Sequence, residues 1–345
     1  MTYSRRLFLL AGLLGLAAIS AFTTPLLAER ESLLIYWIDV EGGAATLLVT
    51  PMGQSILMDT GWNTSDNRDA TRIAAAMRDA EIDRVDFLIT SHFHRDHVGG
   101  LEALADQVEI GQFIDHGDSV EQADERGKQL FETYLDVAGT RRRVVAAGDR
   151  LQVSGIDFSF VVSHRVIRER ISSMGENPLC RGRIPSPADL SENGHSLGYL
   201  LSLGGFQFLN LGDLTTDVQH SLACPESTLP PVDILQVPHH GNGLAPELIW
   251  ALSPSVAVVA NGPRKGGDSA GYEILSQSPA LNDIWQLHYS LDSDSTHNTH
   301  RSRIANLTDE RDCQGHWIKA TVAGDGRSYS ITTSRRSDII SYGWR

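Results

Sequence analysis

The sequence has few cysteines and a deficit of positive charge. Its 345 residues include three cysteines, Cys180, Cys224 and Cys313, which form no Cys-x-x-Cys pair and therefore indicate no cysteine-based metal site. An exported chain can bridge two of them and leave one free, but the sequence does not decide which two. Lysine and arginine number 29 against 43 aspartates and glutamates, a formal charge of −14. Such a surface repels nucleic acid and anionic membranes unless a local basic patch overrides it.

The amino terminus lacks an apolar run long enough for an ordinary membrane span. The run from Leu7 to Phe22 has 16 residues, fewer than the roughly 20 that a spanning helix needs. Arg5 and Arg6 precede it and small residues follow, which is the pattern of a signal peptide. Ser-Arg-Arg-x-Phe-Leu also resembles the twin-arginine export signal. We therefore expect residues 1–28 to direct export to the periplasm or beyond, with an uncleaved membrane anchor as the alternative.

From residue 32 onward, apolar runs alternate with turns. Residues 33–40, 42–50 and 54–61 predict a meander of three antiparallel strands. Further strands or hairpins are predicted at 85–90, 150–163, 197–213, 232–241, 255–262 and 316–333, and helices at 69–80, 101–108, 123–138 and 246–253. The sequence shows no internal repeat and no obvious linker, so we expect one α/β domain over residues 32–345.

One short segment concentrates side chains that bind metals. Within Ser-His-Phe-His-Arg-Asp-His, the residues His92, His94, Asp96 and His97 follow the predicted strand at 85–90. His92 and His94 project to the same face of an extended segment, so their imidazoles can share one cation. Asp96 and His97 lie on the turn into the next helix and point elsewhere, as a second cation would require. Zinc favours imidazole and carboxylate ligands, and the segment therefore predicts a metal site.

His-x-His-x-Asp-His resembles the motif of the metallo-β-lactamase superfamily. Other pieces lie in the family's order: Leu-Met-Asp-Thr-Gly with Asp59, Leu-Asn-Leu-Gly-Asp-Leu with Asp213, and Val-Pro-His-His-Gly with His239 and His240. The resemblance implies an αββα sandwich with two metal ions, usually zinc, at one edge between the sheets. It also implies that Asp59 buttresses the metal ligands and that Asp213 bridges the two ions.

Two ligand assignments stay open. The family's pattern puts the ligand at His240 and leaves His239 to face the substrate, where it can donate a hydrogen bond or shuttle a proton. The reverse order is the alternative, because adjacent residues of an extended segment face opposite ways. His195, in Glu-Asn-Gly-His-Ser-Leu-Gly, lies where many members complete the first metal site. A closer subgroup often lacks a histidine there, so His195 is either a ligand or a polar residue at the rim.

That subgroup is the metallo-β-lactamase-like domain of bacterial DNA-uptake competence proteins and its stand-alone relatives. The similar segments are residues 38–61, 192–214 and 232–241. Because the subgroup includes nuclease-like and phosphodiesterase-like proteins, the resemblance implies phosphoester chemistry. The chain departs from the subgroup's common Asp-Val-Gly-Gln-Gly-Asp-Ala, since it has Glu41 and Ala44 within Asp-Val-Glu-Gly-Gly-Ala-Ala.

Positive side chains gather in the irregular stretch that precedes Glu-Asn-Gly-His. Arg165, Arg168, Arg181 and Arg183 lie there, and Lys265 follows another strand end. Guanidinium groups suit phosphate or carboxylate oxygens, so these side chains are candidates for binding an anionic substrate. The alternative is that the arginines only solvate a surface loop. A small anion fits the charge balance better than long nucleic acid, which needs an extended basic track.

Together these features predict an exported hydrolase with two zinc ions, acting on a small anionic ester or phosphodiester. The ions would share a bridging water and lower its pKa from about 15.7 towards 7, so that the resulting hydroxide attacks. We expect Asp96 to orient the nucleophile or accept its proton as well as bind metal, and His239 to stabilise charge on the reacting oxygen. Two alternatives are a hydrolase of β-lactam or lactone rings, and a metal-containing protein that binds an anion without turnover.

The export signal can be tested directly. Changing Arg5 and Arg6 together to lysine should keep the protein in the cytoplasm with its signal uncleaved, because the twin-arginine route requires the arginine pair. Cell fractionation and the mass of the intact chain measure both effects. Undisturbed export would instead identify an ordinary secretion signal, which needs only positive charge.

Overall fold

The computed structural model describes residue 1 and residues 32–169, 175–310 and 312–343. Apart from Met1, the predicted export signal at 1–28 lies outside the described residues. Among the described helices, none combines the length and the apolar character that crossing a bilayer requires.

The first sheet has nine strands in the order β17-β16-β15-β1-β2-β3-β4-β5-β6. β1, β2 and β3 form the predicted antiparallel meander, and the C-terminal hairpin of β15 and β16 pairs with β1. β3 to β6 run parallel, so their carboxyl ends lie at one edge. The strands span β1 (Ser32–Trp37), β2 (Thr46–Val49), β3 (Ser55–Met58), β4 (Arg84–Ile89), β5 (Glu109–Asp115), β6 (Arg142–Val144), β15 (Ile318–Ala323), β16 (Ser328–Thr333) and β17 (Ile340–Gly343).

The second sheet has eight strands in the order β14-β13-β12-β11-β10-β9-β7-β8. They span β7 (Asp157–Ser163), β8 (Val166–Ile167), β9 (Gly198–Leu203), β10 (Phe206–Asn210), β11 (Ile234–Gln236), β12 (Val256–Val259), β13 (Asp283–His288) and β14 (Ile304–Asn306). β9 and β10 are the predicted hairpin, and β10 to β14 run parallel. The predicted hairpin at 150–163 forms only in part: Arg150 makes a single bridge to Ser159, because β9 and β8 take the two sides of β7.

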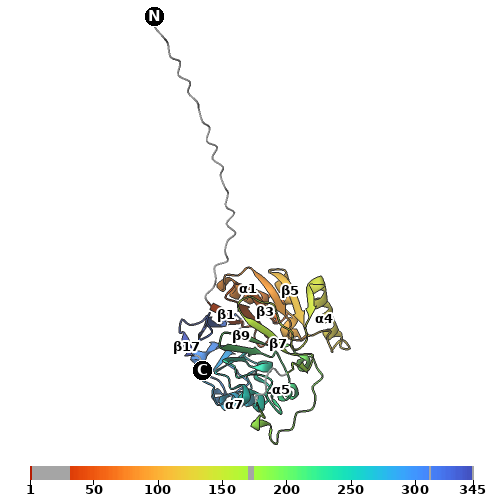
Figure 1. Ribbon diagram of the computed structural model, residues 1–345. Coiled ribbons are helices and arrows are strands. Elements are labelled where there is room, and N and C mark those ends of the chain that lie inside the picture. Colours follow the sequence, from red (N-terminus) through yellow and green to blue (C-terminus); the bar gives the residue numbers. More distant parts are fainter. Residues whose placement is uncertain (2–31, 170–174, 311, 344–345) are drawn as a thin grey trace.

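Helices cover the outer face of each sheet. α1 (Arg68–Asp79), α2 (Arg95–Val98), α3 (Leu101–Ala105) and α4 (Glu125–Ala138) belong to the first sheet's side, and α5 (Thr216–Ala223), α6 (Pro246–Leu252) and α7 (Ser269–Ser276) to the second's. Figure 1 shows α1 and α4 on one side of the stacked sheets and α5 and α7 on the other. In α1, the apolar residues Ala70, Ile73, Ala76 and Met77 are buried, which is helical spacing.

The central core lies between the two sheets. Trp37 of β1 packs edge-on against Phe208 of β10, with ring centroids 5.7 Å apart. Both side chains are fully buried and belong to one apolar cluster that draws residues from strands of both sheets. The predicted αββα sandwich is therefore confirmed. The short helices α5 and α7, which were not predicted, belong to the second helical layer.

Candidate metal centre

Loops from both sheets meet at one edge of the sandwich. β4 ends just before the His-x-His-x-Asp-His segment, which runs into α2. Asp213 follows β10, and His240 lies in the short 3-10 segment Pro238–Gly241 after β11. His239 and His240 both adopt left-handed backbone conformations, with φ of 49° and 55°. The carboxyl ends of parallel strands thus place ligands from distant parts of the sequence side by side.

Four side chains form a tight group that we call the ligand cluster: Asp96, His97, Asp213 and His240. The Nε2 atom of His97 lies 3.3 Å from carboxylate oxygens of Asp96 and Asp213 and 3.3 Å from Nε2 of His240. His240 Nε2 lies 3.3 Å from Asp96 and 3.2 Å from Asp213. Ligand atoms at about 2.0–2.1 Å from a tetrahedral ion are about 3.3–3.4 Å apart. The donor atoms therefore fit one tetrahedral metal ion.

The ligand cluster is buried and strongly coupled. Burial alone would raise the pKa of Asp96 and of Asp213, but His97 and His240 lower the pKa of both carboxyls well below the usual range. Burial opposes charge on the two imidazoles, yet the carboxylates raise the pKa of His97 and of His240. A metal ion that binds here must displace the imidazole protons, so its affinity depends on pH.

Contacts around the cluster fix the tautomers of its histidines. Asp59 accepts hydrogen bonds from the backbone N–H of Ser91 at 2.8 Å and from the Ser91 hydroxyl at 2.7 Å, and its carboxylate lies 2.8 Å from Nδ1 of His97. His240 Nδ1 lies 2.8 Å from the carbonyl oxygen of Ala260. An Nδ1–H held in this way leaves Nε2 to bind a metal. Asp59 thus lies where it orients His97.

His92, His94 and His195 lie outside this tight group. The His92 ring is centred 4.1 Å from that of His97 and 4.7 Å from that of His94. His92 Nε2 is buried and has no hydrogen-bond partner among the described residues, and burial lowers the pKa of His92 well below its usual value. His195 is buried, and its Nδ1 lies 2.8 Å from the carbonyl oxygen of Ser191. A neutral imidazole with an unused buried nitrogen fits a ligand to a second ion.

His239 and Lys265 lie at the rim of the cluster. His239 Nε2 is 4.0 Å from Asp213 and 3.2 Å from the Asn193 amide nitrogen, and 31% of its side chain is exposed. The geometry favours the order in which His240 binds metal and His239 faces outward. Lys265 donates to the Asp96 carboxylate and, at 2.7 Å, to the carbonyl oxygen of Gly42. Its ammonium group brings positive charge next to the Asp96 carboxylate.

The predicted substrate-binding arginines have other partners. Arg165 donates to the Asp189 carbonyl and, at 2.8 Å, to Asp217. Arg181 is 79% exposed and 3.8 Å from Glu176, and Arg183 is 3.9 Å from Glu247. Arg168 lies in a separate pocket beside Ser159. No contact of these four arginines with the ligand cluster is found in the described part of the chain. These contacts give no support for substrate binding by the four arginines at the metal centre, which stays a prediction.

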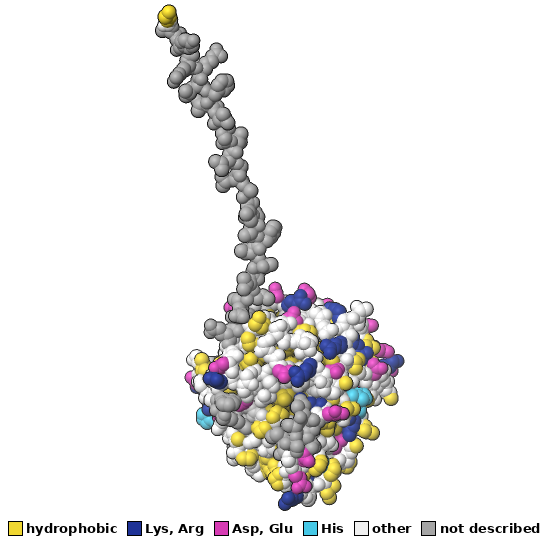
Figure 2. Space-filling view, viewed as in Figure 1, with side chains coloured by type: hydrophobic (Ala, Val, Ile, Leu, Met, Phe, Trp, Pro, Cys, Tyr) yellow, Lys and Arg dark blue, Asp and Glu magenta, His cyan; other side chains and the backbone are white. Residues whose placement is uncertain are grey.

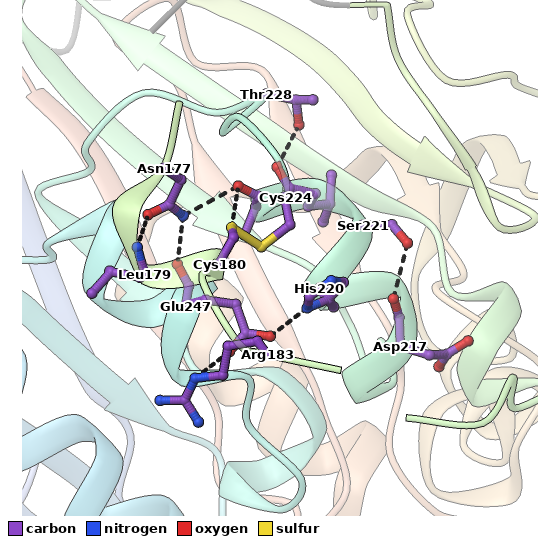
Figure 3. Close-up of a disulfide and its surroundings, with 12 residues drawn as sticks. Asn177, Leu179, Cys180, Arg183, Asp217, His220, Ser221, Cys224, Thr228 and Glu247 are labelled. Carbon is purple, nitrogen blue, oxygen red and sulfur yellow. Dashed lines mark hydrogen bonds and ion pairs between the residues drawn. A yellow bond between two sulfur atoms is a disulfide. The ribbon is translucent and has the colours of Figure 1, made fainter. Parts of the chain in front are cut away.

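A disulfide joins Cys180 to Cys224 and leaves Cys313 as a free thiol. It ties the arginine-bearing stretch to the C-terminal end of α5 (Figure 3). Asn177 strengthens the junction, since its amide nitrogen donates to the carbonyl oxygens of Ala223 at 3.1 Å and Glu247 at 3.2 Å. Residues 177–180 are thus fixed to α5 and α6.

Sequence reasoning missed Glu192, which is fully buried. Its carboxylate accepts from the backbone N–H of Phe93 at 2.9 Å and of Val120 at 2.6 Å, and lies 3.2 Å from His116 Nε2. Burial raises the pKa of Glu192, but His116 and the backbone donors outweigh burial and lower this pKa to about 2. Because Phe93 stands between His92 and His94, Glu192 holds the backbone of the segment that carries these two histidines.

A family model described as the metallo-beta-lactamase superfamily matches residues 38–166. Competence protein ComA of Neisseria gonorrhoeae is 24% identical over 249 residues, which cover 72% of this chain and 29% of the relative. Recombination protein 2 of Haemophilus influenzae is 25% identical over 229 residues, which cover 65% of this chain and 24% of that protein. The chain thus spans less than a third of the length of these curated relatives.

Solved structures with similarity include metallo-beta-lactamase fold proteins. YhfI from Bacillus subtilis gives a TM-score of 0.46 at 10% identity, covering 84% of this chain and 99% of YhfI. MEM-A1, a subclass B3 metallo-beta-lactamase from a soil metagenome library, gives a TM-score of 0.39 at 16% identity, covering 61% of this chain and 78% of MEM-A1.

Glu192→Gln should destabilise the fold, because glutamine offers one acceptor oxygen where the carboxylate offers two charged ones. We expect a loss of about 3 kcal/mol in the free energy of unfolding near neutral pH. Since the folded-state pKa is about 2 against an ordinary value of 4.5, the carboxylate's advantage is fully present above about pH 4.5 and is lost as pH falls towards 2.

Denaturant titrations of wild type and variant at several pH values measure this difference. The exposed Glu176, whose side chain is 72% exposed, provides the control Glu176→Gln, for which no loss is expected. A Glu192→Gln difference that stays constant on acidification would contradict the assignment.

Proposed function

The chain carries a metallo-beta-lactamase superfamily domain, and on that premise we propose that it is an exported hydrolase that uses two metal ions. The observation that supports this most strongly is the ligand cluster. Five distances between its donor atoms lie between 3.2 and 3.3 Å, the spacing about a tetrahedral zinc ion. Buried carboxylates and imidazoles arranged in this way are costly without a cation to share.

In this proposal the ligand cluster holds one ion. His92, His94 and His195 hold the other, with Asp213 contributing to both. When bound, the ions polarise the bond to be broken and make a water acidic enough to act as nucleophile near neutral pH. Asp59 and the Ala260 carbonyl oxygen keep the cluster's two imidazoles in the ligating tautomer.

The remaining polar groups have distinct roles. In this proposal the nucleophile is oriented, or gives up its proton, at the Asp96 carboxylate, which also binds metal. Lys265 orients this carboxylate by donating to its oxygen. Burial lowers the pKa of His239 despite the nearby Asp213. His239 is thus largely neutral near pH 7, and its partly exposed ring can donate to a substrate oxygen or pass on a proton.

The proposed substrate is a small anionic ester or phosphodiester. Lys265 places a cationic group at the rim, where it can contact a substrate oxygen. On the face seen in Figure 2, Lys and Arg side chains lie among Asp and Glu side chains rather than in one continuous band. Such mixing suits a small ligand better than long nucleic acid. Export is supported by the disulfide, since such bonds persist in oxidising compartments.

Metal content and turnover should depend on Asp213. Elemental analysis of the purified protein should find close to two transition-metal ions per chain, mostly zinc. Asp213→Ala should lower that number and abolish hydrolysis, because it removes a carboxylate from the cluster. A substrate panel of bis-p-nitrophenyl phosphate, a chromogenic cephalosporin and a homoserine lactone identifies the reaction. A metal-free but fully active preparation would contradict the proposal, and metal binding without turnover of any substrate would favour an anion-binding protein.

Lys265→Met tests the proposal that the substrate is anionic and that Lys265 contacts its charge. If Lys265 contacts the substrate's charge, kcat/KM on the phosphodiester should fall about ten- to a hundredfold. This is the loss expected when one hydrogen bond to a charged group is removed. The uncharged lactone should lose less than about threefold. The neighbouring Arg264, 67% exposed and paired with Asp309, provides the control Arg264→Met. Equal losses on both substrates would show that Lys265 acts only through Asp96.

A further inference from the structure

Arg168 lies in a pocket remote from the metal centre. The pocket has a volume of about 240 Å³ and is lined by residues of β7, β9 and β10 and by residues 228–230. One of its lining residues, Gln207, is at the start of β10, whereas Asp213 follows the other end of that strand. The pocket and the ligand cluster are therefore at opposite ends of the second sheet.

Arg168 is buried and has no carboxylate partner among the residues that the structure describes. The residue is 8% exposed, and its sole side-chain hydrogen bond among described residues is a long one of 3.3 Å, from Nη1 to the Ser159 hydroxyl. Its Nε is buried and has no partner in the described ranges. Burial and the nearby Arg150 lower the pKa of Arg168, and Asp157 partly opposes them. A guanidinium group stays charged at all ordinary pH values, so this burial is costly unless an anion compensates it.

The rest of the lining is rich in donors. The Gln207 side-chain oxygen accepts from the Ser202 hydroxyl at 2.8 Å, which orients the amide so that its nitrogen, unpartnered among described residues, is free to donate. Arg150 and Asp157 form a 2.8 Å ion pair at the mouth, where their side chains are 59% and 56% exposed. Two arginines against one aspartate leave a net charge of +1 in a chain whose formal charge is −14. The local positive charge therefore opposes the overall charge of the protein.

We propose that this pocket binds a small oxyanion, a phosphate or a carboxylate, with the Arg168 guanidinium as its main cation and the Gln207 amide as a second donor. The planar guanidinium fork matches two oxygens of either group. Leu200, Leu229 and Pro230 form an apolar wall, which suits a ligand whose anionic group carries a short apolar part. The volume is below the roughly 300–1,000 Å³ of pockets for larger ligands.

Calorimetric titration of the metal-loaded full chain with inorganic phosphate, and separately with acetate, tests the site. Wild type should bind at least one of the two. Arg168→Met should weaken that binding tenfold or more, and Gln207→Met several-fold. The control Arg181→Met, which removes an arginine that is 79% exposed, should stay within twofold. Asp213→Asn should retain binding, because it perturbs the metal centre and leaves the pocket intact.

Melting temperatures give a second readout that a purely structural arginine would not produce. Without added anion, Arg168→Met should melt no lower than wild type, since it removes an uncompensated buried charge. With anion, wild type should rise and the variant should not. The proposal is overturned if neither anion binds, or if binding survives Arg168→Met; loss of that binding in Asp213→Asn would then place the anion at the metal centre. Should Arg168→Met fail to fold, unchanged binding in Gln207→Met overturns it.

Discussion

Two buried carboxylates that share two imidazoles are the constraint on which this site depends. Asp96 and Asp213 each lie within 3.3 Å of both His97 and His240. Two negative carboxylates that lie this close to the same imidazoles, and are buried, repel each other unless positive charge lies beside them. Protons on the imidazoles, the Lys265 ammonium and a metal ion all meet this need. A divalent ion meets it best, because it satisfies four donor atoms at once.

The same constraint explains why the backbone around the site is strained. Asp59, His239 and His240 all have left-handed φ values, 66°, 49° and 55°, which non-glycine residues seldom adopt. Each of them follows a strand end, and the sandwich fixes those ends through the packed core between its sheets. Packing within the sandwich therefore supplies the energy that holds unfavourable loop conformations, and those conformations turn the side chains towards the ligand cluster.

The sequence predicted the candidate ligands that lie close together in one segment and those that occur in a family-typical order along the chain. His92, His94, Asp96 and His97 fall within six residues, and the turns that carry Asp59, Asp213 and His240 follow in a recognisable order. The sequence could not predict contacts that only the tertiary fold creates. Glu192 binds the backbone of Phe93, which is 99 positions away in the sequence, and no residue pattern marks that pair.

The arginines show the same limit more sharply. Their clustering in the sequence suggested one anion-binding surface, but the fold distributes them. Arg165 pairs with Asp217, Arg181 and Arg183 lie near the disulfide-linked segment, and Arg168 enters a different pocket. In an irregular stretch, closeness in the sequence says little about where the side chains point, because such a stretch has no fixed periodicity.

The disulfide connects the proposed export to the geometry of the centre. α5 starts three residues after Asp213, and the irregular stretch is attached to this helix at both ends, by Arg165 to Asp217 and by Cys180 to Cys224. The stretch then leads into Glu192, which holds the backbone of the segment from His92 to His97. No cysteine belongs to the ligand cluster, so metal binding there does not depend on the redox state of the compartment. A chain that folds before it crosses the membrane could therefore bind its metals first and form the Cys180–Cys224 disulfide afterwards.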